Sequence, residues 1–361
     1  MKGILIGLEY RLSGDKRLLR RRLEGAGPTF VKLGQFVANR PDVFGKELSK
    51  ELGSLQDSVA CVPMKAPRGL DSFEEEPFAA ASIAQVHRGT YKGRQVAVKL
   101  KRPGIAQSIR SDLGVLKLLD KKFVGDLETS LLKELDFKQE LKNAQEFARM
   151  YEFDSSIVVP RVYPEVSSDD VIVMDYVPSA QKVTSAPRLI NLFLNQLLFE
   201  SLVHGDLHSG NIGLVHGPPM NSSESIVLYD FGNVIRTTED YREAVRDFVW
   251  HVQSRDVSRI LGDLRRMGMY VAHEDATRAF IRKLLRYLET QDLKEFRFSA
   301  DEIQERVPVV LDPVTAALVR SFSLLEGYCK SVDPGFSYES IIQSNLETLF
   351  SDIGWLFRRL Q

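Results

Sequence analysis

The residues with the clearest chemical potential lie in the stretch LVHGDLHSGNIG at 202–213. Within it His204, Asp206 and Asn211 have the spacing H-x-D-x-x-x-x-N, which is typical of the catalytic loop of phosphotransferases. In such a loop the aspartate accepts the proton of the attacking group, and the asparagine offers its amide oxygen to Mg²⁺. The pattern predicts Asp206 as a catalytic base and leaves its acceptor open among a protein hydroxyl, a small molecule and water.

Three further residues complete the set that phosphoryl transfer requires. Asp230, in YDFGN, follows an apolar run 24 residues after Asp206, and its carboxylate with the amide oxygen of Asn211 would supply oxygen ligands for Mg²⁺. Lys99, in VAVK, can reach the α- and β-phosphates of ATP, and Glu140 can hold its ammonium in place. V-A-V-K and D-F-G are each common in ordinary strands and turns, whereas their combination in this order is specific. The sequence therefore predicts an enzyme that uses ATP and Mg²⁺.

The loop expected to cover the phosphates is rich in alanine. AAASIAQVH, at 79–87, stands where kinases carry G-x-G-x-x-G. Alanine lacks the freedom of glycine at positive φ, so this backbone should be stiffer and should cradle phosphates in a different geometry. Close packing of an Ala-rich strand, without a ligand, is the alternative. We predict that the nucleotide is bound by this loop, by Lys99 and by the hinge segment, through Ala79, Ala80, Ala81, Ser82, Ala84, Gln85, Met174, Asp175 and Val177.

No platform for a peptide substrate is predicted after Asn233. The stretch VIRTTEDYREAVRDF runs directly into a helical pattern, with no A-P-E sequence and no long activation segment. Activity on proteins is therefore disfavoured.

A small sheet and a helix must position Lys99 and Glu140. Residues 78–105 alternate apolar and polar types around Lys92-Gly93, which predicts two antiparallel strands. Residues 131–150 contain no Gly or Pro and are predicted as one helix, followed by strands within 158–166 and 170–177.

The second half of the chain is predicted to be mostly helical. The exception is a short strand within 225–233, after a turn-rich loop at 216–225. Helices are expected over 189–202, most of 238–289, and 313–360.

The N-terminal part is predicted to be helical as well. A basic cluster at 16–22 has leucines at helical spacing, which fits either a solvated helix face, the reading we prefer, or a patch for anionic lipid. Further helices are expected to begin at Pro28 and to span about 45–56.

These elements together predict an α+β, two-lobed protein-kinase-like fold, with a small β-rich N-lobe, extra N-terminal helices and a large helical C-lobe. The predicted segments are 1–26, a basic N-terminal segment; 27–72, a helical extension; 73–178, the N-lobe; and 179–361, the C-lobe.

Composition limits the possible partners. The chain has 361 residues, 48 Lys and Arg against 49 Asp and Glu, and 43% hydrophobic residues, so it can bury a large core and has no global charge for binding nucleic acid. Its two cysteines suggest neither a zinc site nor a disulfide scaffold. No secretion signal and no uncharged apolar stretch of about 18 residues is seen, so we expect an intracellular protein, soluble or at the membrane periphery.

Several motifs together resemble the UbiB family of atypical kinase-like ATPases. The KxGQ motif of that family appears as Lys32-Leu33-Gly34-Gln35, its Ala-rich loop as AAASIAQVH, and its ExD motif as Glu134-Leu135-Asp136. The resemblance continues through HGDLHSGN and DFGN to SLLEGYCKSVDPGF, and it covers about residues 25–340.

The resemblance implies a function and a mode of regulation. Members of the family support coenzyme Q biosynthesis and related isoprenoid-lipid metabolism, so a lipid or a lipid-biosynthesis complex is an implied partner. By that resemblance the KxGQ helix folds across the cleft where a peptide would lie, with Lys32 and Gln35 directed toward Glu134, Asp136 and the nucleotide. Many members carry a transmembrane segment, which is not visible in this sequence.

Four readings compete. The first is a UbiB-like ATPase that binds Mg-ATP and hydrolyses it, with protein phosphorylation restrained by the KxGQ helix. The second is a small-molecule or lipid kinase, because HGDLHSGN also resembles the catalytic loop of aminoglycoside and choline kinases. The third is a nucleotide-binding scaffold without catalysis, and the fourth is a true protein kinase.

Overall fold

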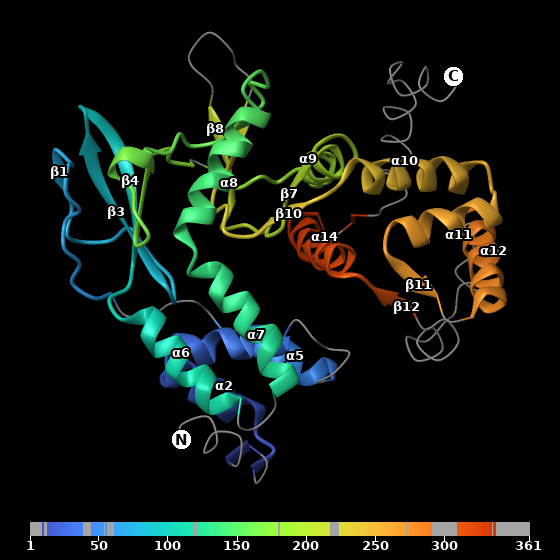
Figure 1. Ribbon diagram of the computed structural model, residues 1–361, viewed down its shortest axis with the longest axis horizontal. Coiled ribbons are helices and arrows are strands. Elements are labelled where there is room, and N and C mark those ends of the chain that lie inside the picture. Colours follow the sequence, from blue (N-terminus) through green and yellow to red (C-terminus); the bar gives the residue numbers. More distant parts are fainter. Residues whose placement is uncertain are drawn as a thin grey trace. The chain divides into compact units, whose positions relative to one another are not determined.

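The chain folds into two compact units. The computed structural model describes residues 9–10, 13–38, 45–53, 55, 61–117, 121–179, 181–216, 224–271, 273–290, 309–333 and 335–336. Unit 1 consists of Met1–Pro178 together with Asp230–Gly232, and unit 2 consists of Ser179–Tyr229 and Asn233–Gln361. Both contain helices and small sheets, which confirms the predicted α+β class (Figure 1).

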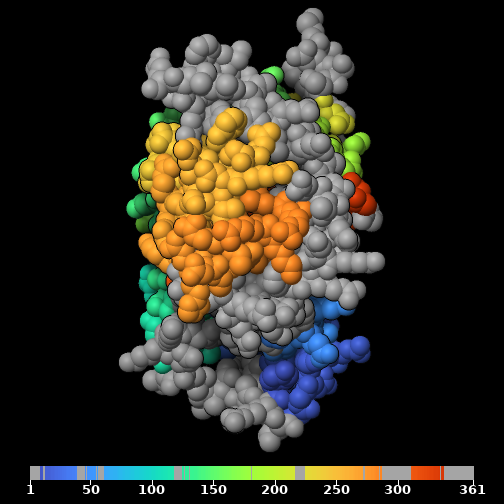
Figure 2. Space-filling view, turned by 90° about the vertical axis from the view of Figure 1, so that its right-hand side faces the viewer, coloured from blue at the N-terminus to red at the C-terminus, as the bar shows by residue number. Residues whose placement is uncertain are grey.

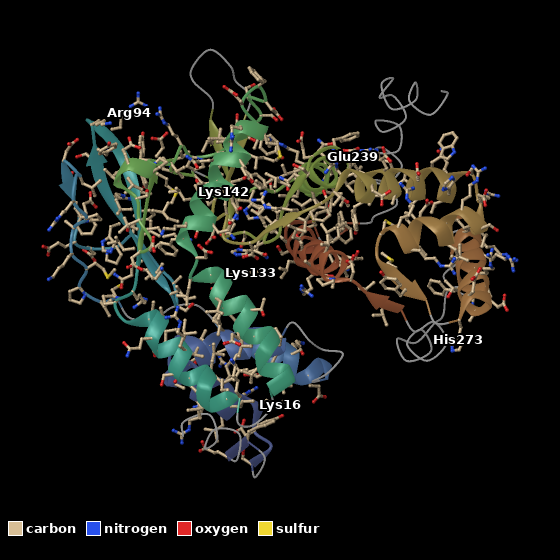
Figure 3. The ribbon with its side chains drawn as sticks, viewed as in Figure 1. Lys16, Arg94, Lys133, Lys142, Glu239 and His273 are labelled. Atoms are coloured by element: carbon tan, nitrogen blue, oxygen red, sulfur yellow. The ribbon has the colours of Figure 1, made fainter. Side chains whose placement is uncertain are left out.

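An antiparallel sheet forms the β-rich part of unit 1, in the strand order β1-β3-β4-β6 with β2 paired to β3. The predicted hairpin is confirmed: β3 and β4 are joined by a two-residue turn in which Lys92 and Gly93 have φ angles of 50° and 72°. Both angles are positive, as a tight turn of this length requires. Arg94 marks the start of β4 at this turn in Figure 3. The strand bounds are β1 Ser72–Phe73, β2 Ala79–Ala80, β3 Ala84–Tyr91, β4 Arg94–Lys101 and β6 Val171–Asp175.

The alternation along β4 decides which side chains face the core. Val96, Val98 and Leu100 are buried in a cluster with Tyr163 and Val173 on one face. Successive side chains in a strand point to opposite faces, so Lys99 lies on the other face of the sheet.

Helices from the N-terminus and from the segment after β4 share a second core. They are α2 (Lys16–Ala26), α3 (Pro28–Ala38), α5 (Lys46–Leu52), α6 (Ile105–Leu116) and α7 (Lys121–Glu134). Close approach here depends on Gly34 of α3, because a Cβ at this position would lie 2.2 Å from Cδ1 of Leu55 and 3.1 Å from Cδ1 of Leu23. The N-terminal helices predicted from the sequence are thereby confirmed.

The basic cluster of α2 is matched by acidic side chains. Arg20 pairs with Glu51 of α5 at 3.0 Å and with Glu24 at 3.2 Å, and Lys16 pairs with Glu47. These contacts favour the reading of α2 as a solvated, ion-paired helix face.

The helix predicted over 131–150 is interrupted, and the prediction of one continuous helix was wrong. α7 ends at Glu134, and α8 (Phe137–Met150) begins after a break at Leu135 and Asp136. The carboxylate of Asp136 accepts a hydrogen bond from the backbone N–H of Gln139 at 3.0 Å and so caps α8. Figure 3 labels Lys133 before this break and Lys142 after it.

The strand predicted within 158–166 is mostly absent. β5 (Ile157–Val158) touches this range, Val162 forms an isolated antiparallel bridge with Met174 of β6, and residues Pro164–Val166 form a 3-10 turn. Pro160 and Pro164 lack the N–H that a sheet ladder needs, which explains the difference.

Unit 2 contains more strands than the sequence predicted. Its helices are α9 (Ala186–Phe199), α10 (Glu239–Gln253), α11 (Val257–Arg266), α12 (Glu274–Thr290) and α14 (Pro313–Val332). Its strands are β7 (Leu202–His204), β8 (Ile212–His216), β9 (Glu224–Leu228), β10 (Val234–Arg236), β11 (Met269–Val271) and β12 (Val309–Leu311). The pairs β7–β10, β8–β9 and β11–β12 are antiparallel. β9 confirms the strand predicted within 225–233, whereas the other strands, of three to five residues, were not predicted.

Helices α10, α11 and α12 pack around a small apolar cluster that includes Ile260, Leu261, Ile281 and Leu285. Their outer residues form one continuous patch, yellow to orange in Figure 2. The residues at 217–223 and the helix predicted through 337–360 lie outside the described part of the chain. Among the described helices, none is both long and apolar enough to cross a bilayer.

Candidate active site

Lys99 is the centre of the site in unit 1. It lies on β4 opposite Val86 of β3 and Ile172 of β6, and its side chain is 14% exposed. Its Nζ lies 2.6 Å from Oε1 of Glu140 and 3.2 Å from Oδ2 of Asp230. The structure thus brings together three of the residues that the sequence predicted, although they are separated by up to 131 positions in the chain.

Glu140 is held by the first turn of α8. Asp136 caps this helix, and the ring of the fully buried Phe137 lies beneath the ammonium groups of Lys99 and Lys101, at 5.5 and 4.7 Å from the centroid. Cation–π contacts of this kind add to the positioning of a lysine. Asp136, Phe137 and Glu140 all lie at the N-terminus of α8, so this one end of the helix positions Lys99.

Burial and the charges of neighbouring groups shift the pKa values of Lys99 and Glu140 in opposite directions. Burial raises the pKa of Glu140 to about 7, although the ammonium of Lys99 opposes the shift. For Lys99, burial lowers the pKa, but the attraction of Asp230 and Glu140 outweighs it, so that the pKa is raised overall. Lys99 is therefore a firmly protonated cation beside a buried carboxylate whose pKa is raised.

Asp230 has an unusual backbone. Its φ angle is 55°, in the left-handed region that few residues other than glycine adopt, and its Oδ1 accepts a hydrogen bond from Gly232 N at 3.1 Å. Strained backbone of this kind is concentrated at functional sites. A Cβ on Gly232 would lie 3.2 Å from Oδ1 of Asp230 and 3.7 Å from Oε2 of Glu140, so glycine leaves room beside both carboxylates.

α8 also secures the turn after Asp230, through residues that the sequence analysis missed. Asn143 is buried and donates a hydrogen bond from Nδ2 to the carbonyl oxygen of Phe231 at 2.8 Å. The rings of Phe147 and Phe231 lie 5.0 Å apart. Asn143 and Phe147 lie three and seven positions after Glu140, which is the helical spacing of one face and the signal that could have identified them.

The loop that carries Asp206 is held within unit 2. Nδ2 of Asn211 donates to the backbone oxygen of Asp206 at 3.0 Å, and lies 3.4 Å from its carboxylate. Gly205 exchanges two hydrogen bonds with Asn233, at 2.7 and 3.0 Å. The side chain of Asp206 is 38% exposed, so this loop presents a carboxylate to solvent from a fixed backbone.

His204 orients the loop from beneath. It is fully buried, its Nδ1 lies 3.2 Å from the N–H of Asp206, and its Nε2 lies 3.0 Å from the carbonyl oxygen of Tyr229. The neutral tautomer with its proton on Nε2 satisfies both contacts, since Nδ1 then accepts and Nε2 donates. His204 therefore supports the backbone of the loop that carries Asp206.

The residues predicted to hold Mg²⁺ offer a suitable donor set. The carboxylate of Asp230 and the amide oxygen of Asn211 are hard oxygen donors, which Mg²⁺ binds together with substrate phosphates and water. Among the described residues, no group of three or more His, Cys, Asp or Glu side chains is arranged to hold a metal ion. Tyr229, immediately before Asp230, donates its N–H to the backbone oxygen of Asn211 at 2.9 Å, which leaves the side-chain amide oxygen out of this bond. Carboxylate and amide oxygens of this kind would suit Mg²⁺ bound together with phosphate oxygens.

The Ala-rich loop forms a tight hairpin between β2 and β3. Ala79 and Ala80 pair with Val86 and Gln85, and the N–H of Ala81 donates to Ala84 O at 2.8 Å. This backbone lies on the same sheet as Lys99, as a phosphate-covering loop requires.

Two residues of this loop that are predicted to contact the nucleotide have buried side chains. Ser82 and Gln85 are buried, and the amide of Gln85 bonds both backbone groups of Val62, at 2.7 and 3.0 Å. Through these hydrogen bonds Gln85 ties the loop to the segment before β1, and its contact with a nucleotide stays a prediction.

The hinge residues occupy the end of β6. Met174 pairs with Ala97 of β4, and Oδ1 of Asp175 accepts a hydrogen bond from the hydroxyl of Tyr163 at 2.5 Å. Val177 follows in a half-buried position. In a neighbouring cluster that was not predicted from the sequence, the guanidinium of Arg88 lies over the rings of Phe78 and Tyr176, at 5.5 and 5.2 Å from their centroids.

One residue of the KxGQ motif contacts one residue of the ExD motif. Nζ of Lys32 lies 3.2 Å from Oε2 of Glu134, at the end of α7. Nε2 of Gln35 donates to the backbone oxygen of Leu55 at 3.4 Å. Glu134 thus ends one helix and pairs with α3, while Asp136 caps the helix that carries Glu140.

Comparison with known proteins places these features in a family. Residues 62–264 match the family described as the ABC1 atypical kinase-like domain. The chloroplastic protein ACTIVITY OF BC1 COMPLEX KINASE 7 of Arabidopsis thaliana is 30% identical over 90% of this chain and 53% of its own length. The probable protein kinase UbiB of Xylella fastidiosa is 27% identical over 92% of this chain and 69% of its own length. The chain spans about half the length of several of the curated relatives that it matches.

A solved structure shares the fold. The complex of Rv3197 with erythromycin from Mycobacterium tuberculosis aligns with a TM-score of 0.53 at 22% identity, covering 73% of this chain and 75% of that protein. At this identity the likeness shows the fold alone, and it supports the two-lobed kinase-like architecture predicted from the sequence.

Proposed function

Because the chain belongs to the ABC1, or UbiB, family of atypical kinase-like proteins, we propose that it binds Mg-ATP and hydrolyses it, in support of coenzyme Q or other isoprenoid-lipid metabolism. The observation that carries the nucleotide part of this proposal is the placement of Lys99 Nζ at 2.6 Å from Glu140 and 3.2 Å from Asp230. A buried lysine oriented by a helix carboxylate and lying beside a metal-binding aspartate is the arrangement that holds a triphosphate in kinase-like enzymes. The link to isoprenoid lipids rests on the family resemblance.

Each residue then has a defined task. Lys99 donates to the α- and β-phosphates, and Glu140 keeps its ammonium directed at them. Asp230 and Asn211 supply the oxygen ligands of Mg²⁺, which when bound neutralises charge on the phosphates. Asp206 accepts the proton of the attacking group, on a backbone that His204 and Asn211 hold in place.

Water is the acceptor that we favour for Asp206. The contact of 3.2 Å between Lys32 and Glu134 supports a KxGQ helix fixed against the end of α7, the helix that precedes the one carrying Glu140. By the family resemblance, a helix fixed there would restrain transfer to protein hydroxyls. Replacing Gln35 should loosen this restraint and expose autophosphorylation, whereas unchanged labelling of the protein would argue against it.

The experiment that tests the function follows the γ-phosphate. Purified protein is incubated with γ-labelled Mg-ATP, with and without lipid vesicles, and label is measured in free phosphate, in protein and in organic-extractable product. Asp230→Asn serves as the blank. Label released only as free phosphate, and more of it with vesicles, supports the proposed ATPase. Label on a small molecule or lipid would instead indicate a kinase for that acceptor, and no release above the blank would indicate a scaffold.

A further inference from the structure

The tip of the Ala-rich loop is buried, although a phosphate-covering loop would be expected to face solvent. Since Ala81 N–H bonds to Ala84 O at 2.8 Å, Ser82 and Ile83 form a two-residue turn. They are 1% and 5% exposed. Turn residues this deeply buried must be covered by another part of the protein.

The residues that cover it belong to the apolar core shared by α2, α3, α5, α6 and α7, which we call the N-terminal helical cluster. Ile83 belongs to the apolar cluster that contains Phe30 of α3, Leu52 of α5 and Ile109 of α6. Phe30 lies two positions before Lys32 on the KxGQ helix. The tip of the loop and the KxGQ helix therefore belong to one packed core.

Arg102 forms a second tie at the same point. Its Nε donates to the oxygen of Ala81 and its backbone N–H to the oxygen of Ile83, both at 2.9 Å, and its side chain is buried. Arg102 lies three residues after Lys99 and three before Ile105, which begins α6 and belongs to the same cluster. One short segment thus connects the phosphate-binding lysine, the loop and the helices.

We propose that the Ala-rich loop and the N-terminal helical cluster move as one body, with Ile83 and Arg102 as the positioning residues that join them. The loop is then preorganised for a nucleotide, and less ordering is needed when a nucleotide binds. A partner or surface that shifts α3 would also shift the Ala-rich loop and so change the affinity for nucleotide. The site on α3 and the nucleotide site would be coupled because both act on the same body. The effect on nucleotide rests on the proposed function, whereas the mechanical connection does not.

The connection is tested by hydrogen exchange without nucleotide. Leu52→Ala makes a cavity in the helical cluster, and Leu261→Ala makes one in unit 2; both leucines are 1% exposed, so they are matched controls. We expect amide exchange in the peptide covering residues 79–86 to become at least about tenfold faster in Leu52→Ala only, because local opening follows local packing. Equal rates in the two variants, or a rate in Leu52→Ala equal to wild type, would overturn the proposal. If Leu52→Ala does not fold, Arg102→Ala replaces it.

The consequence for the nucleotide is tested with a fluorescent ATP analogue and Mg²⁺. Arg102→Ala should raise its Kd roughly tenfold and change kcat less than twofold, since the released loop must be ordered on binding. Arg102→Lys should restore part of the affinity, and Arg94→Ala, which removes an exposed arginine at the far end of β4, should leave it unchanged. An unchanged Kd in Arg102→Ala would contradict the proposal. If wild type binds no nucleotide, the proposed function fails, and the exchange result alone decides whether the loop is anchored.

Discussion

Lys99 carries one positive charge beside two carboxylates, and this imbalance governs what the centre can bind. A triphosphate alone would add further negative charge next to Glu140 and Asp230. Mg²⁺ at Asp230 would remove the excess and leave the ammonium free to meet the phosphates. Nucleotide and metal should therefore bind as a pair.

Replacing Asp230 tests this coupling. Asp230→Asn keeps the size of the side chain but removes the charge that attracts Mg²⁺, so stabilisation by Mg-ATP should disappear. Thermal unfolding with and without Mg-ATP measures it, because a ligand that binds only the folded state raises Tm. A full shift in the variant would mean that the metal is held elsewhere.

Replacing Asp206 should separate chemistry from binding. A general base contributes about 10²–10⁴-fold to a rate, so Asp206→Asn should reduce turnover by that factor. The Kd for Mg-ATP should change little, because Lys99 and Asp230 are intact. Phosphate release under single-turnover conditions measures the loss, and undiminished turnover would remove Asp206 from the mechanism.

At the scale of elements, α8 is the part that assembles the site in unit 1. It begins at the Asp136 cap and presents Phe137, Glu140, Asn143 and Phe147 on one face. A helix holds such a set with a fixed spacing, so the lysine and the turn after Asp230 are positioned by the same element.

The cap can be tested by substitution. Asp136→Ala should lower the free energy of unfolding by about 1 kcal/mol, because an N–H in the first turn of α8 loses its acceptor. Asn also caps helices well, so Asp136→Asn should restore most of the loss. Chemical denaturation measures both. An Asn variant as unstable as the Ala variant would show that the charge, rather than the cap, is what matters.

Two glycines in neighbouring helices give a matched test of close packing. A Cβ on Gly34 would overlap Leu55, whereas a Cβ on Gly25 of α2 meets nothing within 4 Å. Gly34→Ala should therefore cost about 1–3 kcal/mol, and Gly25→Ala should stabilise by about 0.5–1 kcal/mol through helix propensity. Denaturation midpoints of the two variants should move in opposite directions. Similar shifts would mean that α3 can move away from Leu55 freely.

The sequence identified the elements whose signals are local. Lys99 and Asp230 stand in short motifs at the end of predicted strands, and the hairpin around Lys92-Gly93 was confirmed because its turn residues and alternation are contiguous. The break at Asp136 was missed, since capping depends on where the chain must turn rather than on propensity. Asn143 was missed because its partner, the Phe231 carbonyl, lies 88 positions away. The short strands β7, β10, β11 and β12 likewise form only through pairing with strands that lie far away in the sequence.

At the scale of the whole molecule, the buried charges should make stability depend on pH. Burial raises the pKa of Glu140 from its ordinary value near 4.5 to about 7, so the folded state holds this proton more tightly than the unfolded state. The resulting stability is fully present below pH 4.5 and is lost as pH rises toward 7. The raised pKa of Lys99 affects the free energy of unfolding only above about pH 10, well outside the range from pH 4.5 to 7.

Comparison with Glu140→Gln isolates this effect. Between pH 5 and 7.5, without nucleotide, wild type should lose on the order of 1–3 kcal/mol relative to the variant, which cannot titrate. Glu200, whose pKa burial also raises, is present in both proteins and cancels. Denaturation curves at several pH values measure the difference. Parallel pH profiles would mean that Glu140 ionises normally beside Lys99.

Three residues, Asp230–Gly232, belong to unit 1 although the chain on either side of them belongs to unit 2. The carboxylate that completes the lysine centre is thus encoded far downstream of the rest of its unit. A gene fragment ending at Pro178 would supply Lys99 and Glu140 but not Asp230, and the remaining fragment would supply Asp230 without the lysine. Neither fragment alone would therefore hold the complete centre of Lys99, Glu140 and Asp230.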